Sequence, residues 1–483
     1  MNLVLRVSRP INVQLIETQV RTPTTRHPVK LLSKAQQLLG RVRHMGDFTH
    51  PSRERDRVLD AVRLVSLATV VAYHVLAGSP TLVRGKPAMS ANYHVHWLFW
   101  LIPLMPLFFF AGAAANLQSW ESGKSWGEFL MSRTTRLFRP VFYFLAFVAL
   151  VTTLLRITMG NSRQLLYLEM RHIELLWYVG AYLLTLAFMP WLARIRTGRR
   201  LAWFIATMCL LTALIDTISV ITDTWVMTGW INMIFVWLVP AALGIAYQRG
   251  LIPRRLALAA AAVALGAAVA LAILGPYPTG LIANMPPTLL LATSAIVECL
   301  VVIALAPAIN RWLQGARTWR FLELCNSGSM TIYLWHWVVT FLLSYGVYLA
   351  LHIGLVGPRD AWYWPGNVLR LAIVCAIVAV FFVPLRATER RALPWWDRPI
   401  PPMGKGRDIT VGVLVLIGAI LTLVYTRIYV INPGWGGFTP IGRWVIVASL
   451  IPLAAARVLC RKPLPGRASS SDDQLPLVQS ASR

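Results

Sequence analysis

The sequence predicts an all-α, polytopic integral membrane protein with about twelve transmembrane helices and both termini in the cytoplasm. The first observation is composition: of 483 residues, 57% are hydrophobic and 13% are charged, and the mean hydropathy is +0.59. Such values lie outside those of an ordinary soluble domain. The second is a series of apolar segments about 20 residues long, the length with which a helix crosses a bilayer. The third is that Lys and Arg are concentrated in alternate connections, as the positive-inside rule requires.

Twelve apolar segments are candidate membrane spans. In order, they cover residues 58–77, 96–116, 140–156, 174–192, 201–219, 226–247, 256–275, 288–308, 329–350, 367–386, 409–429 and 441–460. The first ten form the expected core, and the last two form an additional C-terminal pair. The third segment is short and the fifth contains Asp216, so these two depart furthest from a plain apolar span.

Five alternate connections carry most of the basic residues and set the expected orientation. These residues are Lys124, Arg133, Arg136, Arg139, Arg194, Arg196, Arg199, Arg200, Arg249, Arg254, Arg255, Arg311, Arg317, Arg320, Arg386, Arg390, Arg391, Arg398, Lys405 and Arg407. The intervening connections are poor in Lys and Arg, and residues 276–280 and 432–440 contain neither. The formal net charge of +27 is explained by cytoplasmic loops that face anionic lipid, so we expect no nucleic-acid partner.

Segments outside the spans complete the expected organisation. Residues 1–56 are basic and start without the apolar run of a signal peptide; they form a surface-lying helix around 31–42 or a disordered cytosolic segment. Residues 57–390 make up the membrane core, and 391–460 contain a cytoplasmic loop and the additional pair of spans. The Ser-rich tail, 461–483, is expected to be disordered. The five cysteines are scattered without paired spacing, so we expect neither a disulfide framework nor a metal site.

The first span carries polar residues that a plain membrane anchor would avoid. Ionisable residues inside a membrane segment usually mark function, because a charge in hydrocarbon costs at least a few kcal/mol. Arg63 and His74 are eleven helical steps apart, so they return to nearly the same face, with a rise of about 16 Å between them. Asp60 lies one turn before Arg63 on the same side. The alternative is an interfacial ion pair plus a histidine that only bonds a neighbouring helix.

An arginine series precedes the third span. Arg133, Arg136 and Arg139 recur every three residues before Pro140, which places all three on one broad side of a helix at the cytoplasmic surface. Guanidinium groups bind phosphate bidentately, so the series suits a phosphate-rich ligand. The competing explanation is that these residues only fix the topology, as basic loop residues do in other membrane proteins.

Further candidate residues lie on later spans. Glu174 and Trp177, at the outer edge of the fourth span, are candidates for substrate binding, or else a solvated carboxylate and a member of the interfacial aromatic belt. Asp216 is close enough to the outer boundary to reach water, whereas Glu298 lies deeper.

The ninth span contributes a second histidine. Tyr333 and His336 are three residues apart and therefore share one helix face, and Trp335 and Trp337 flank the histidine. His336 is either a second catalytic or substrate-binding imidazole or a hydrogen-bonding residue of the helix core.

Four of these motifs together resemble acyltransferase family 3, the polytopic membrane acyltransferases that modify cell-envelope carbohydrates. They are Arg63 and His74 separated by ten residues, PLFFFAG on the second span, RTTRLFRP before the third, and the run from Ser329 to Trp337 that reads SMTIYLWHW. The resemblance covers roughly residues 55–390. The chain departs from the family at Ala111, where serine is usual, and in its two additional spans.

The resemblance implies an acyl-coenzyme A donor from the cytosol and an acceptor hydroxyl on an envelope sugar or glycolipid. The acyl group would be acetyl or another short chain, the coenzyme a co-substrate rather than a bound cofactor, and the location a bacterial plasma membrane. Donor phosphates would meet Arg63, held by Asp60, together with the arginine series. His74 would be the general base, for which a neutral imidazole with an ordinary pKa of about 6.5 is suited.

A transporter or flippase of an envelope glycolipid precursor is the main alternative. Twelve spans, cytoplasmic termini and sparse intramembrane charges are typical of transporters. The halves of the chain show no convincing repeat, which weighs against it. A membrane scaffold without chemistry is a third alternative, and the ionisable residues of the first span argue against that.

Overall fold

The computed structural model describes residues 56–83, 86–91, 105–160, 172–224, 229–277, 287–351, 362–431 and 441–461. All of them belong to one compact unit that begins at Asp56. The expectations for the basic N-terminal segment and for the C-terminal tail therefore lie outside the described residues.

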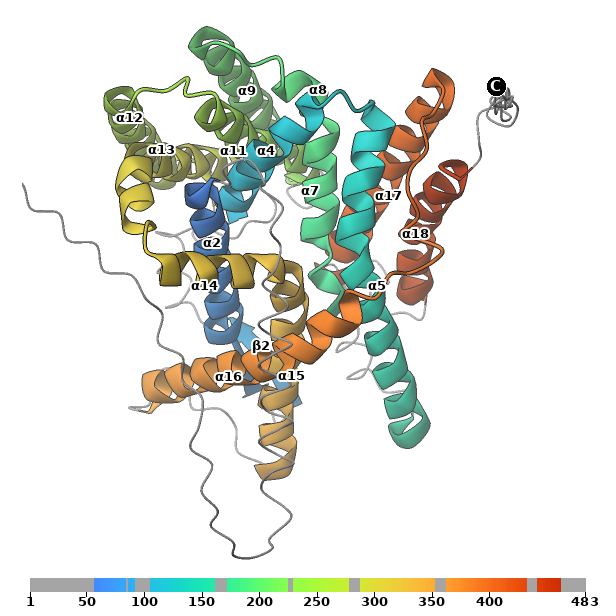
Figure 1. The fold of residues 1–483 in the computed structure, drawn as a ribbon. Helices are drawn as coiled ribbons and strands as arrows, with labels where there is room; N and C mark the ends of the chain where they lie inside the picture. The colour runs from blue at the N-terminus through green and yellow to red at the C-terminus, as the bar shows by residue number, and fades with distance from the viewer. Residues whose placement is uncertain are drawn as a thin grey trace, which may run out of the picture. The chain divides into compact units, whose positions relative to one another are not determined.

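Helices make up nearly all of the described chain (Figure 1). They are α2 (Arg57–Ala77), α4 (Met105–Glu121), α5 (Trp126–Met159), α7 (Trp177–Ala187), α8 (Met189–Leu192), α9 (Gly198–Thr222), the 3-10 turn η1 (Gly229–Ile231), α11 (Asn232–Gln248), α12 (Arg254–Leu274), α13 (Leu289–Trp312), α14 (Ala316–Ser327), α15 (Ser329–Leu351), α16 (Tyr363–Glu389), α17 (Lys405–Ile431) and α18 (Ile441–Leu459). Each of the twelve expected spans overlaps one of these helices, and α14 is an additional helix that the span analysis did not contain.

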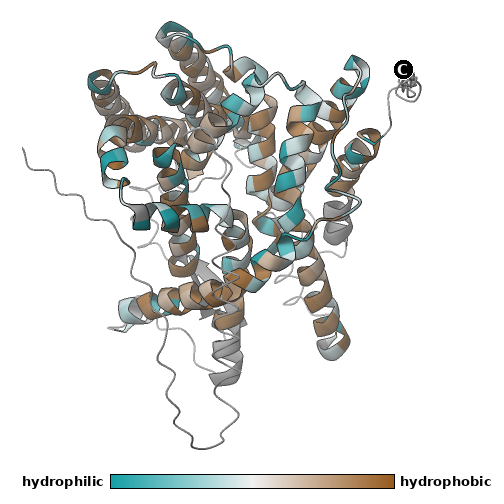
Figure 2. Cartoon of the chain, viewed as in Figure 1, coloured by the Kyte–Doolittle hydropathy of each residue, from teal (hydrophilic) through white to brown (hydrophobic). Residues whose placement is uncertain are grey.

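Seven helices of the described chain are long and apolar enough to cross a membrane by length and composition: α2, α5, α9, α12, α13, α16 and α17. Shorter apolar helices cover His172–Ala187, Asn232–Gln248, Ser329–Leu343 and Ala448–Leu459. Figure 2 shows long brown stretches along these elements. A multi-pass membrane protein is thus confirmed, while the number of twelve crossings and the position of the termini stay predictions.

Two local features differ from the expectations. The third span is not short, because α5 continues through Pro140 and reaches 34 residues; membrane helices tolerate an internal proline when neighbouring groups satisfy the freed backbone. The second feature is an antiparallel hairpin directly after α2, in which β1 (Gly78–Val83) pairs with β2 (Lys86–Ala91). The helical fold therefore carries a small strand pair at the end of the helix that bears His74.

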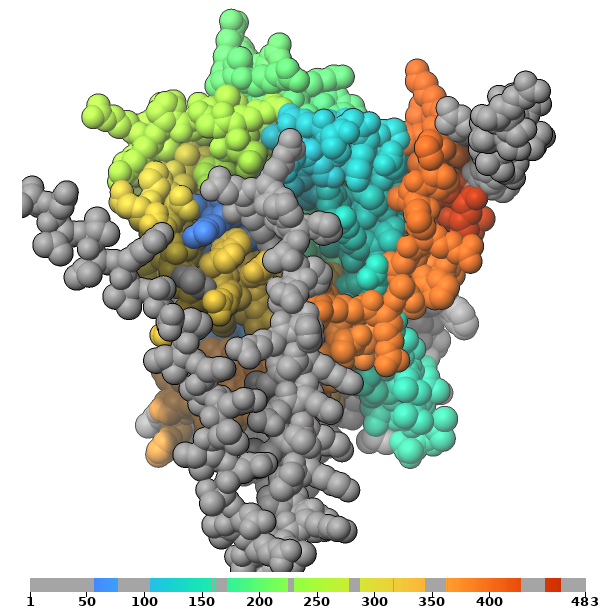
Figure 3. Space-filling model, in the orientation of Figure 1, coloured from blue at the N-terminus to red at the C-terminus, as the bar shows by residue number. Residues whose placement is uncertain are grey.

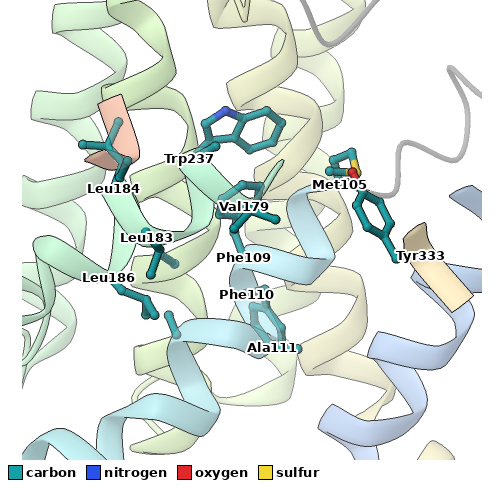
Figure 4. Packing of buried hydrophobic residues seen from close by; sticks show 14 of the residues in the cluster. Met105, Phe109, Phe110, Ala111, Val179, Leu183, Leu184, Leu186, Trp237 and Tyr333 are labelled. Atoms are coloured by element: carbon teal, nitrogen blue, oxygen red, sulfur yellow. The ribbon is translucent and has the colours of Figure 1, made fainter. Parts of the chain in front are cut away.

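The core lies where α4, α7 and α11 meet (Figure 4). Phe109 packs on Trp237 with ring centroids 4.5 Å apart and both side chains fully buried. Glycines make this packing possible: a Cβ at Gly244 would lie 2.1 Å from the carbonyl oxygen of Phe110, and one at Gly112 would lie 2.4 Å from the Tyr182 ring. Gly112 of α4 and Gly244 of α11 thus permit close approach of the helices.

The additional C-terminal helices are built into the same unit. Asp408 of α17 accepts hydrogen bonds from the backbone N–H groups of Gly127 (3.1 Å) and Glu128 (3.0 Å), which caps the N-terminus of α5. Gly180 of α7 lies so close to α17 that a Cβ would meet the carbonyl oxygen of Ala419 at 2.7 Å. In Figure 3 the orange surface that precedes and starts α17 adjoins the cyan surface of α5. α17 therefore packs against the helix that carries the arginine series and caps its N-terminus.

Candidate active site

Two histidines that are far apart in sequence meet between α2 and α15. Nδ1 of His74 and Nε2 of His336 lie 2.9 Å apart, across 262 residues of chain. The two rings are nearly parallel, with an angle of 7° between their planes and centroids 5.1 Å apart. Because ring nitrogens donate and accept in the plane of the ring, the contact joins ring edges rather than stacked faces. The face of the first span that carries Asp60, Arg63 and His74, here called the polar stripe, thus ends at a histidine pair.

The backbone fixes the proton positions in this pair. Nδ1 of His336 lies 3.0 Å from the carbonyl oxygen of Ile332, one turn back on α15. A carbonyl only accepts, so Nδ1 of His336 carries the proton and its Nε2, in the neutral ring, accepts. The donor to Nε2 is then the Nδ1–H of His74, which leaves Nε2 as the basic nitrogen of neutral His74. The arrangement is that of a base whose tautomer is set by a second group.

Residues around His336 hold α15 in place. The hydroxyl of Tyr333 donates to the carbonyl oxygen of Leu175 at 2.8 Å. The buried carboxylate of Glu389, at the end of α16, accepts from Nε1 of Trp335 at 3.0 Å and from the hydroxyl of Thr331. The rings of Trp337 and His74 lie 4.8 Å apart between centroids, with an angle of 60° between their planes. Thr331, Tyr333 and Trp335 of the SMTIYLWHW run thus bond to the segment before α7 or to α16, and these bonds fix the position of His336 on α15.

Arg370 of α16 is a buried cation next to this pair, and the sequence analysis missed it. The residue is only 6% exposed. It donates from Nη2 to the carbonyl oxygen of Val75, which follows His74, and to Oδ1 of Asn367 at 2.7 Å. The carbonyls of a last helical turn lack partners within the helix, and a cation there also complements the helix dipole. Arg370 thus secures the turn of α2 that presents His74.

The other end of the stripe carries Arg63 and Asp60. Nη1 of Arg63 lies 3.7 Å from Oδ1 of Asp60, and Nη2 donates to the carbonyl oxygen of Ala111 at 3.1 Å. The Asp60 side chain is 2% exposed, whereas that of Arg63 is 27% exposed. The carboxylate therefore orients a guanidinium that keeps accessible surface.

The three arginines of the series have different surroundings. Arg133 is half-buried and interacts electrostatically with Arg63, Arg136 and Tyr182, and its Nε finds no hydrogen-bond partner in the described chain. Arg136 is exposed. Arg139 instead donates from Nε (2.9 Å) and Nη2 (2.5 Å) to Oδ1 of Asp397, in the loop before α17. Of the three arginines, Arg133 is the one that interacts with Arg63, whereas Arg139 binds Asp397 of the loop before α17.

Tyrosines connect the arginine end to the histidine end. Tyr178 of α7 lies 5.3 Å from Tyr333 and 5.8 Å from Tyr182, between ring centroids, and interacts electrostatically with Arg63. The residue is half-buried, and Phe108 and Phe109 also pack on it. Sequence reasoning had no signal for Tyr178, because its partners come from three other helices.

Glu174 and Trp177, both expected at the outer edge of the fourth span, differ in burial. Glu174 is half-buried. Trp177 is buried and packs against Trp237 at 6.0 Å, so it is a core residue and not a member of an interfacial belt. The neighbouring His172 is buried too, with its ring 5.2 Å from Phe341 of α15.

Of the two carboxylates expected inside the membrane segments, Asp216 differs from the expectation and Glu298 does not. Asp216 does not reach water: it is buried and accepts from Asn232 Nδ2, Tyr277 Oη and the backbone N–H of Leu289, each at 2.8 Å. Burial and this carboxylate raise the pKa of the Tyr277 phenol. Asp216 therefore ties four segments together. The carboxyl oxygens of Glu298 are buried without a hydrogen-bond partner in the described chain.

Comparison with known proteins gives one match. A family model described as an acyltransferase domain matches residues 56–386, which is more than two thirds of the chain. The matched range contains both histidines, Arg63, Arg133 and Arg370. No curated protein and no solved structure matches the chain. Among the described residues, no group of three His, Cys, Asp or Glu side chains could hold a metal ion.

Proposed function

The chain belongs to acyltransferase family 3, and on that premise we propose that it moves a short acyl group from cytosolic acyl-coenzyme A to a hydroxyl group of an envelope sugar or glycolipid. The family match makes it a membrane acyltransferase, which sets the transporter alternative aside. The observation that carries the proposed chemistry is the hydrogen bond between His74 and His336.

In the proposed reaction His74 is the general base. Its Nε2 takes the proton of the acceptor hydroxyl while the oxygen attacks the thioester carbonyl carbon. The tetrahedral intermediate then collapses, the carbon–sulfur bond breaks, and the proton passes from His74 to the departing thiolate. His336 keeps Nδ1–H of His74 engaged throughout, so the imidazolium that forms is stabilised without rotating. A positioned general base contributes typically 10²–10⁴-fold to the rate.

Arg63 and Arg133 are the proposed donor site. Two guanidiniums that approach each other repel unless an anion lies between them, and phosphate is the anion for which arginine has matching geometry. Asp60 pairs with one side of the Arg63 guanidinium. The Nε of Arg133 has no hydrogen-bond partner in the described chain, so Arg133 has a donor left for a phosphate oxygen. Arg139, already paired with Asp397, contributes to the site only by fixing the loop.

The distance between the two ends suits a long donor. The helix rise separates Arg63 from His74 by about 16 Å. One extended donor molecule would therefore place its phosphate group at Arg63 and its reacting thioester at His74. Tyr178 lies between these ends and is the proposed lining residue. The acceptor would approach His74 from the outer side, where Glu174 is a candidate contact.

Purified protein with radiolabelled acetyl-coenzyme A tests the proposal. An acyltransferase releases free coenzyme A as it transfers the acetyl group. We expect slow transfer to water and faster transfer when an envelope acceptor is added, and His74→Ala should abolish both reactions. Protein that binds the donor but never cleaves it, with or without an envelope lipid extract, would contradict the proposed chemistry. A change in lipid masses by one acyl group in a strain that lacks the gene identifies the acceptor.

A further inference from the structure

α14 is a short amphipathic helix that the proposed reaction does not use. It lies between α13 and α15 and passes across α2 in Figure 1. Its contacts are with the first two turns of α2, so it lies at the end where this candidate membrane span begins. The loop that contains α14 also carries Arg311, Arg317 and Arg320, and the charge pattern assigns it to the cytoplasmic side.

One face of α14 is docked on the start of α2. Nδ2 of Asn326 donates to the carbonyl oxygen of Asp60 at 2.8 Å, and Leu322 packs in a buried cluster with Ala61. The ring of Trp319 lies under the guanidinium of Arg57 at 5.1 Å. These contacts fix the helix rotation, so the composition of its opposite face is defined.

The opposite face combines large apolar side chains with arginines. At about 100° per residue, Leu324 and Phe321 lie within about 40° of Arg317, on the side away from Leu322. Phe321 is 60% exposed and Leu324 is 52% exposed. Arg317 and Arg320 are exposed as well. Glu323 is also exposed but lies about 120° from Arg317 and about 40° from Trp319, at the border with the docked face. Figure 2 shows teal and brown alternating along this helix, and Figure 3 shows gold residues at the surface beside the blue start of α2.

We infer that this face of α14 lies in the cytoplasmic headgroup layer and binds anionic phospholipid. Apolar side chains flanked by arginines are the composition of helices that rest at the headgroup–acyl boundary. The surface potential of a cytoplasmic leaflet is negative, which complements Arg317 and Arg320. Since α14 is fastened to the backbone of Asp60, it joins the leaflet surface to the helix that bears the donor-binding arginine.

The test uses full-length protein in nanodiscs of phosphatidylglycerol and phosphatidylcholine, with the native cysteines replaced. A fluorophore at Phe321→Cys reports the proposed lipid-facing side, and the same fluorophore at Glu323→Cys is the matched control, about 160° away around the helix at the border with the docked face. Lipids of each class that carry a nitroxide quencher near the headgroup report which lipid is adjacent. We expect stronger quenching at position 321 than at 323, and stronger quenching by phosphatidylglycerol than by phosphatidylcholine.

Arginine variants test the charge. In R317Q/R320Q the local preference for phosphatidylglycerol should fall by up to about fivefold per arginine, the factor equivalent to about 1 kcal/mol each. R390Q/R391Q, which removes two arginines elsewhere in the predicted cytoplasmic loops, should leave the preference unchanged. Equal quenching at 321 and 323, or an unchanged preference in R317Q/R320Q, would overturn the inference. A label at 321 shielded from lipid and from aqueous iodide would assign the face to a protein contact instead.

Discussion

His336 variants distinguish an orienting role in the reaction from a role in helix packing. Glutamine places an amide oxygen near the position of the ring Nε2, so His336→Gln can still accept the Nδ1–H of His74. Asparagine reaches only as far as the ring Nδ1, so His336→Asn can keep the bond to the Ile332 carbonyl but loses His74. The two variants therefore remove different hydrogen bonds from the same buried position.

The expected magnitude follows from the bond to His74. A hydrogen bond to a charged group is worth about 1.5–3 kcal/mol, and His74 is charged in the transition state of the proposed reaction. At 1.36 kcal/mol per factor of ten, His336→Asn should lower kcat by about 10- to 150-fold. His336→Gln should stay within about tenfold of the natural protein, and the donor KM should change little in either, because the phosphate end is about 16 Å away.

The assay is acyl transfer by membranes that contain each variant at matched protein levels. A double-mutant cycle adds the second readout: in a His74→Ala background, His336→Asn should cause no further loss, because its effect acts through His74. If the packing role is the correct one, His336→Asn is active and His336→Gln is not. That order of activities, with both variants correctly inserted, would refute the reasoning.

Three further predictions concern the donor site, the core and the topology. Arg133→Gln should raise the donor KM by about 10- to 100-fold, as the loss of one charge-assisted phosphate contact costs about 1.5–3 kcal/mol, whereas Arg139→Gln should lower thermal stability and leave KM unchanged; equal KM effects would contradict this division. Gly244→Ala should lower the melting temperature, since its Cβ would lie 2.1 Å from a backbone oxygen of α4, and a melting temperature equal to that of the natural protein would refute the packing. An impermeant thiol reagent should label a cysteine at Asn432 but not one at Arg199 in intact cells, and the reverse pattern would invert the orientation.

The helices could be predicted from sequence because each is specified locally. Twenty apolar residues form a membrane helix whatever surrounds them, so every expected span has a helical counterpart. The polar stripe from Arg63 to His74 is equally local, since helix geometry alone sets the face. The length of α5 was the exception, because Pro140 ends a helix in water more readily than in a membrane.

Partnerships between distant segments could not be predicted in the same way. The sequence marks His74 and His336 as candidates, but nothing in it joins two residues 262 positions apart. Arg370 has no motif, and its significance comes from the carbonyl of Val75 that it contacts. Arg139 is a similar case: the three-residue spacing predicts a shared helix side, but it does not reveal that Asp397, 258 positions away, pairs with the last arginine of the series.

The central claim is that His74 transfers the proton, and His74→Gln tests it most directly. Glutamine keeps a hydrogen-bonding side chain at this position but cannot accept and return a proton at neutral pH. The measurement is kcat for acyl transfer, together with donor binding by the same variant. The account predicts a loss of about 10²–10⁴-fold in kcat with donor affinity retained. Near-normal transfer by His74→Gln would contradict it and remove His74 from the chemistry.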